Sequence, residues 1–193
     1  TLSMRQIAYI PGFVLLPGRY SIKFLVHDRD TDRIGIYQTS VVIPNLSREV
    51  QNIPISSVVL SSELVSFNGA ANSALDPLII EGKRLIPGVT GAFSNRRDLI
   101  VFLHAYEPNA TAPEPLTAFV TLYRGQTKVF ETAQVVFKED LARKLRTVPV
   151  TLSVPLTNVP AGGYDCAVSV LAPATQKSAV WRSSLRVGNS RPA

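Results

Sequence analysis

Apolar and polar residues alternate in short runs along most of this chain, and Pro, Gly and Asn separate one run from the next. Alternation places every second side chain on the same face of an extended strand, so it indicates β-strands with one buried face. Gly125 and Gln126 fit a hairpin turn, and Leu141 and Leu145 fit one helical turn within 138–145. The predicted strands are 20–27, 34–43, 99–106, 117–124, 128–137, 147–154, 164–171 and 179–187.

The strand pattern repeats at a constant offset of 144 residues, so that Gly18 falls on Gly162 and Tyr20 falls on Tyr164. Without a gap, Ile22, Phe24, Val26, Tyr37, Val41 and Ile43 then fall on Cys166, Val168, Val170, Trp181, Leu185 and Val187. In both copies the residues at every second position after the Tyr are apolar. We therefore expect one buried strand face to be used twice.

A Tyr just after a turn, at the start of a late strand, is typical of the tyrosine corner of immunoglobulin-like sandwiches. Cys166 lies two residues after Tyr164 but has no partner Cys, and no Trp lies on an earlier strand. Antibody-type domains are therefore excluded, and the wider sandwich architecture remains the prediction. The fold class predicted is all-β, an immunoglobulin-like or fibronectin III-like β-sandwich with one complete unit preceded by the tail of another.

This interpretation divides the chain into 1–48, the last strands of a truncated unit plus a linker (44–48), and 49–193, a complete sandwich. The first part holds about three strands, whereas a free-standing sandwich usually has about seven. Either upstream strands are missing, or the early strands pair with the sheets of the second unit. Truncation is the favoured alternative, and pairing of the early strands with 99–106 would refute it.

Several segments resemble the C-terminal region of the acidobacterial VWFA-related (von Willebrand factor type A-related) proteins. The likeness rests on the runs LPGRYSIKFLVHD (16–28), TDRIG (31–35), VIPNL (42–46) and ISSVVLS (55–61), and 77–187 is similar in style. Such proteins carry a secretion signal and a type A domain ahead of β-rich segments. The Asp-x-Ser-x-Ser adhesion motif of the type A domain is absent from these residues. The resemblance implies an exported, non-enzymatic accessory region, secreted, periplasmic or on the cell surface.

Composition agrees with a globular chain: 46% of residues are hydrophobic and 18% are charged, and no apolar run approaches the length of a membrane span. No membrane insertion is therefore expected. The net charge is +6, but the basic residues are scattered, and the clusters Arg96-Arg97 and 143–146 are not interleaved with aromatic residues. Nucleic-acid binding is therefore not predicted.

The one metal-like cluster is Asp28, Asp30 and Asp32, three carboxylates at alternate positions of a turn that could bind Ca²⁺ through oxygen. Arg33 and Thr39 stand where a calcium loop of the EF-hand type needs Gly and Glu. The other interpretation is a polar hairpin turn without a cofactor. The repeat supports it, because Ala172, Ala174 and Gln176 occupy the equivalent positions.

The remaining chemical groups favour structural roles. His27 and His104 lie within strand patterns without a nucleophile beside them, so no enzyme is predicted. Cys166 falls on Ile22 in the repeat, which favours a core position over a reactive thiol. Trp181 falls on Tyr37, which favours packing over stacking on a sugar ring.

The function expected is therefore a non-catalytic extracytoplasmic spacer or protein-interaction module beside a type A domain, with a protein as its partner. The alternative is a carbohydrate-binding β-sandwich module. An incomplete first sheet would also leave open edges, which permit an edge-strand homodimer.

Overall fold

A computed structural model describes residues 14–49, 51–67, 76–106, 115–138 and 147–189. The chain separates into two compact units, Thr1–Asn45 and Leu46–Ala193. This division lies within the predicted linker. The expected helical turn at 138–145 falls almost wholly outside the described residues. No helix among the residues described has the length and apolarity needed to cross a membrane.

The first unit contains one antiparallel hairpin, β1 (Gly18–Asp28) and β2 (Arg33–Ile43), which pairs Gly18 with Ile43 and Asp28 with Arg33. Within the described part of the chain, β1 and β2 form a sheet of their own, and 99–106 belongs to a different sheet. The pairing that would refute truncation of the first unit is therefore not seen.

Among the described residues of the second unit, the regular elements are all strands except a 3-10 turn (Leu46–Arg48) at its start. Its strands are β3 (Val59–Ser61), β4 (Leu64–Ser66), β5 (Ile79–Ile80), β6 (Lys83–Leu85), β7 (Ala92–Ser94), β8 (Leu99–Tyr106), β9 (Leu116–Arg124), β10 (Thr127–Glu131), β11 (Val135–Phe137), β12 (Thr147–Val154), β13 (Gly162–Ala172) and β14 (Lys177–Gly188). The all-β fold class predicted from the alternating pattern is confirmed.

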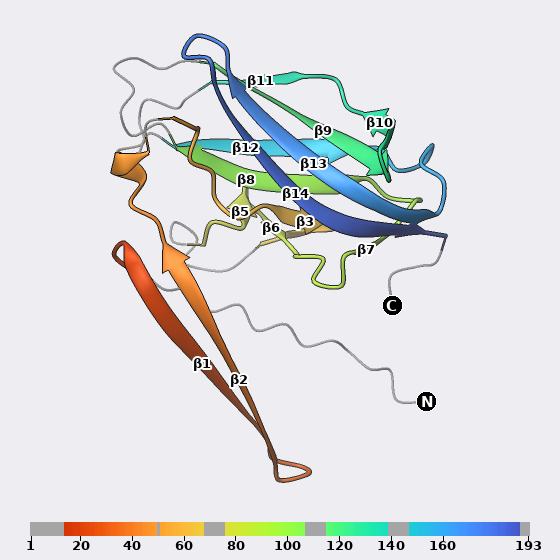
Figure 1. Ribbon diagram of the computed structural model, residues 1–193. Helices are drawn as coiled ribbons and strands as arrows, with labels where there is room; N and C mark the ends of the chain where they lie inside the picture. The colour runs from red at the N-terminus through yellow and green to blue at the C-terminus, as the bar shows by residue number, and fades with distance from the viewer. Residues whose placement is uncertain (1–13, 50, 68–75, 107–114, 139–146, 190–193) are drawn as a thin grey trace. The chain divides into compact units, whose positions relative to one another are not determined.

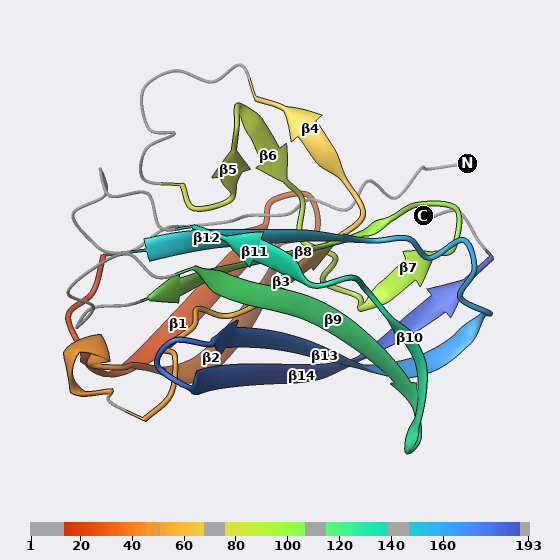
Figure 2. The same cartoon turned by 90° about the horizontal axis from the view of Figure 1, so that it is seen from above.

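Two sheets of the second unit face each other across an apolar core (Figures 1 and 2). One sheet has the order β10-β9-β13-β14-β7, with β11 also paired to β9, and the other has the order β12-β8-β3. All neighbours in these sheets are antiparallel except β14 and β7, which run parallel. Every second residue of β8, β9, β12 and β13 points into the core, as the period-2 pattern requires.

A third, smaller sheet with the order β4-β6-β5 covers the outer face of β8. Leu78 and Leu85 pack there against Phe102, which points away from the main core. This is why 99–106 is apolar nearly throughout: β8 is covered on both faces, as Figure 2 shows from above.

The predicted single strand 128–137 is wrong, because the structure divides it into β10 and β11. The pairing of β10 with β9 shifts register between Lys128 and Phe130. Beyond it, the Thr132 amide donates to the Val120 carbonyl at 3.0 Å, and the Val120 amide donates to the Thr132 hydroxyl at 3.0 Å. The Thr132 hydroxyl takes the place of a backbone carbonyl as the acceptor for Val120, and the strand is interrupted at this point.

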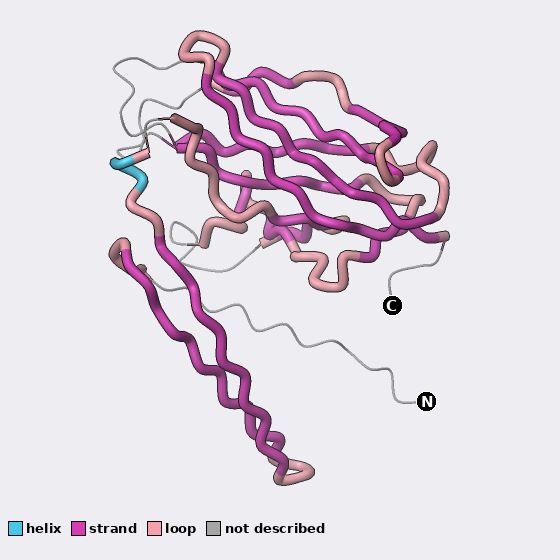
Figure 3. Tube along the Cα trace, in the orientation of Figure 1, coloured by secondary structure: helices cyan, strands magenta, loops and turns pink. Residues whose placement is uncertain are grey.

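The two hairpins of the predicted repeat, β1-β2 and β13-β14, are both long antiparallel pairs (Figure 3), and they have the same register. Gly18 pairs with Ile43 in the first, and Gly162 pairs with Val187 in the second. Both turns end on a residue with positive φ, Asp32 at 54° and its equivalent Gln176 at 57°. The repeat therefore extends from sequence to strand pairing and turn geometry.

Candidate functional site

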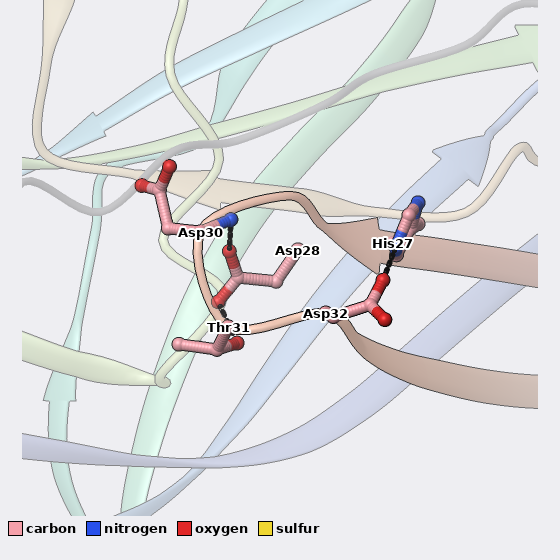
Figure 4. A network of polar contacts seen from close by, with 5 residues as sticks. All are labelled: His27, Asp28, Asp30, Thr31 and Asp32. Carbon is pink, nitrogen blue, oxygen red and sulfur yellow. Dashed lines mark hydrogen bonds and ion pairs between the residues drawn. The ribbon is translucent and has the colours of Figure 1, made fainter.

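The acidic turn between β1 and β2 is stabilised by local hydrogen bonds (Figure 4). One oxygen of the Asp28 carboxylate accepts from the Asp30 amide at 3.0 Å, and the other accepts from the Thr31 hydroxyl at 2.6 Å. The bond from Thr31, followed by that from the Asp30 amide, lowers the pKa of Asp28 below its usual value. These bonds are those of a side chain that caps its own turn.

The other two carboxylates point in different directions. Asp32 Oδ1 lies 2.8 Å from His27 Nε2, while the Asp30 side chain projects away from both neighbours in Figure 4. Within the described ranges, no group of three or more His, Cys, Asp or Glu residues is arranged to hold a metal ion. Calcium binding by Asp28, Asp30 and Asp32 stays a prediction, and the geometry is that of a hydrogen-bonded turn.

The equivalent turn in the second hairpin forms without the acids. There the Thr175 hydroxyl, which corresponds to Thr31, donates to the Ala172 carbonyl at 3.5 Å. The same register and the same positive φ at Gln176 are reached with uncharged residues. The acidic side chains are therefore not needed for the turn conformation.

Both repeat tyrosines form the corner that the sequence suggested. The Tyr20 hydroxyl donates to the Leu16 carbonyl at 2.9 Å, and the Tyr164 hydroxyl donates to the Pro160 carbonyl at 2.6 Å. Each bond spans four residues, so each ties the start of its strand to the preceding loop.

The second corner has an additional partner from β9. Arg124 donates through Nη2 to the Tyr164 hydroxyl at 2.7 Å, and its guanidinium lies 4.9 Å from the centre of the Tyr164 ring. This contact combines a charge-assisted hydrogen bond with a cation–π interaction. Sequence reasoning missed Arg124, because nothing in the local pattern relates β9 to the loop before β13.

The histidine on β8 packs between aromatic rings. The His104 ring centre lies 5.0 Å from that of Phe102 in an edge-on arrangement and 6.3 Å from that of Tyr106. Burial raises the pKa of Tyr106. This position agrees with the structural role expected for His104.

Cys166 belongs to the sandwich core, and Trp181 packs against it. Cys166 is fully buried, and desolvation raises the pKa of its thiol to about 12. Trp181 is partly buried and packs against the same core. The predictions of a core Cys and a packing Trp are confirmed.

A hollow of about 480 Å³ lies on the outer face of the larger sheet, near the β9-β10 turn. Pairing places Tyr123, Asp165 and Ser184 side by side across three strands, with Ala167 and Arg182 in the next row. The Ser184 hydroxyl donates to Asp165 at 3.0 Å. The small side chain of Ala167 leaves this surface hollow.

Compared with known proteins, the chain matches no protein-family model and no curated protein sequence. Function is therefore inferred from the structure itself, from the two tyrosine-cornered hairpins (β1-β2 and β13-β14) and from the outer-face hollow near the β9-β10 turn.

Proposed function

We propose that this chain belongs to an extracytoplasmic, non-catalytic array of β-sandwich units that spaces or presents a neighbouring domain and contacts other proteins. The observation that carries the proposal is the pair of tyrosine-cornered hairpins, which share one register at an offset of 144 residues. Repetition of one supersecondary unit is the mark of modular arrays. A type A domain beside the array is what the sequence resemblance implies.

The proposal takes the second unit as an immunoglobulin-like sandwich. Its sheet orders, β12-β8-β3 and β9-β13-β14, correspond to E-B-A and C-F-G in such domains, with the tyrosine corner at the start of strand F. In this alignment β13 and β14 are the last hairpin of the unit. The hairpin β1-β2 is then the last hairpin of another unit.

A spacer has to resist extension, and the parallel pair β7 and β14 suits that role. Tension on the two ends of the chain reaches the start of β7 once β3 to β6 are pulled out. It then shears two parallel strands, so their hydrogen bonds are loaded together. The Arg186 amide donates to the Gly91 carbonyl at 2.8 Å, and the Asn95 amide donates to the Gly188 carbonyl at 3.0 Å.

The test is single-molecule stretching of the full chain between handles at its two ends. We expect the part of the second unit from β7 to β14 to open in one discrete step of at most about 340 Å, from about 3.5 Å per residue over 92–188. Gradual extension without a discrete step would contradict the spacer role.

A matched pair of variants locates the resistance. Arg186→Pro removes an amide that bonds to Gly91, and we expect it to lower the opening force. Arg182→Pro is the control on the same strand. The Arg182 backbone also faces away from β13, but β7 does not pair with β14 at this position. It should leave the force nearly unchanged.

The outer-face hollow favours a second candidate, a carbohydrate-binding module. Tyr123 offers a ring for stacking, and Asp165 and Arg182 offer hydrogen-bonding groups beside it. A glycan array followed by Tyr123→Ala tests this candidate. Binding that survives the substitution would exclude the hollow as the sugar site.

A further inference from the structure

The hairpin β1-β2 exposes a face whose counterpart in the second unit is core. Tyr164, Cys166, Val168 and Val170 of β13 are at most 3% exposed. In the first hairpin, the equivalent Ile22 and Phe24 are half-buried. Further along the same face, Val26 is 66% exposed, and Tyr37, opposite Phe24, is 63% exposed. An apolar face of this kind on a two-stranded sheet marks an interaction surface.

Among the described residues, no strand pairs with the outer edge of β1 either, and this edge is called the open edge of β1. In the second unit β13 has β14 on one side and β9 on the other, while β1 has β2 as its only sheet neighbour among the described residues. The Arg186 amide donates to Gly91 on β7's side and therefore points away from β13. Backbone N–H and C=O groups alternate in direction along paired antiparallel strands. The backbone groups of every second residue of β13, from Asp165 to Leu171, therefore point toward β9.

The shared register transfers this assignment to the first hairpin. The backbone groups of Ser21, Lys23, Leu25 and His27 then face the open edge of β1. Each of these residues has its equivalent in the β9-facing set of β13 at the offset of 144.

We propose that the open edge of β1 and the apolar face of the hairpin bind an antiparallel strand with the alternation of β9, supplied by a preceding sandwich unit of the same polypeptide. This inference rests on the proposed array of sandwich units. In the second unit, Leu122, Val120 and Ala118 of β9 lie opposite Cys166, Val168 and Val170 of β13. In the same register, the inward residues of the added strand would lie opposite Ile22, Phe24 and Val26.

A second copy of the hairpin fits this surface less well. Two β1 edges could pair, but the resulting four-stranded sheet would still expose the apolar faces of both hairpins. A sandwich unit supplies the edge strand together with a facing sheet, as β9 and the β12-β8-β3 sheet do around β13.

The contact of Arg124 with the second corner points in the same direction. The β9 strand delivers Arg124 to the Tyr164 ring and hydroxyl. The strand that joins β1 would end beside Tyr20 in the same register, next to a hydroxyl that already donates to Leu16.

The experiment adds a synthetic peptide with the β9 sequence LTAFVTLYR, flanked by lysines for solubility, to the isotope-labelled full chain and follows amide resonances. We expect saturable shifts at Ser21, Lys23, Leu25 and His27, with amide exchange slowed about tenfold at these positions. A peptide of the same composition in scrambled order should produce neither effect, because it lacks the alternation.

Lys23 and Gln38 face each other across the hairpin and provide the matched variants. Lys23→Pro removes a donor on the open edge of β1, whereas Gln38→Pro removes one on the outer edge of β2, and neither amide is used between the two strands. We expect Lys23→Pro to abolish the peptide shifts and Gln38→Pro to keep them. Amide contacts between β1 and β2 verify that the hairpin stays folded in both proline variants. Phe24→Lys should weaken peptide binding by at least tenfold, because it places a charge on the apolar face.

Three results would overturn the inference: no saturable shifts, equal loss in both proline variants, or a dimer of the free chain with the β1 amides already protected. The last result would assign the edge to a second copy. None of them bears on the stretching step of the second unit, so the two proposals fail separately.

Discussion

Removing the hydroxyl of Tyr164 should destabilise the second unit measurably. Tyr164 is 3% exposed, and its hydroxyl donates to Pro160 at 2.6 Å and accepts from Arg124 at 2.7 Å. Tyr164→Phe loses one neutral and one charge-assisted hydrogen bond while it keeps the ring under the guanidinium. Water can reach the Arg124 side of the contact, so we expect a loss of about 1–2 kcal/mol in the free energy of unfolding.

The assay is urea denaturation followed by the fluorescence of Trp181, the only Trp of the chain, which packs on the core of the same unit. With a slope of about 1.5 kcal/mol per molar urea, the midpoint should fall by about 1 M without a change of slope.

Tyr20→Phe is the matched control for this measurement. It removes the corner bond of the first hairpin, in a different unit from Trp181. The Trp181 transition should shift by less than about 0.3 M, because the free-energy change of the second unit is near zero. A Tyr164→Phe shift no larger than that of Tyr20→Phe would refute the argument that the corner and Arg124 hold the second unit together.

Two further predictions concern single groups. Cys166 should resist a thiol reagent at pH 8 in the folded chain and react once urea unfolds it, because burial raises the pKa of its thiol to about 12; rapid labelling of the folded chain would contradict the core position. The pKa of Asp28, read by carboxyl resonances, should lie below 3.8 and move toward it in Thr31→Val, since the Thr31 hydroxyl bonds to the ionised form. A lowered pKa in the folded state means that this contribution to stability is present near neutral pH and lost as the pH falls through the folded value; an unchanged pKa in Thr31→Val would contradict the assignment.

Long strands were predictable because their alternation extends over eight or more residues. The bounds of β8 and β12 agree with the predicted 99–106 and 147–154, and β1, β9, β13 and β14 differ from prediction by a few residues at their ends. The strands β3 to β7 have only two or three residues each. A run that short has no measurable period, so their pairing depends on tertiary contacts that local sequence does not encode.

The candidate metal site shows a different limit of sequence reasoning. Three acids at alternate positions were expected in a turn; Asp30 and Asp32 lie in it, and Asp28 is the last residue of β1. Spacing does not determine which atoms the carboxylates contact. Asp28 bonds to its own turn and Asp32 to His27, so two of the acids already have local partners. Arg124 was missed for a related reason: its contact with Tyr164 joins residues 40 positions apart.

The repeat offered more information than either hairpin alone, because it compares the same strand pair in two environments. Pattern predicted which face of β1 and β13 is apolar, and the structure shows that face buried in one copy and largely open at Val26 and Tyr37 in the other. What covers a strand face is a property of its non-local neighbours, so identical alternation can be core or surface. Because the two hairpins share one register, this difference leads to a specific expectation. Strand β9 lies beside β13, and among the described residues β1 has no such neighbour, so we expect a strand with the alternation of β9 to pair there.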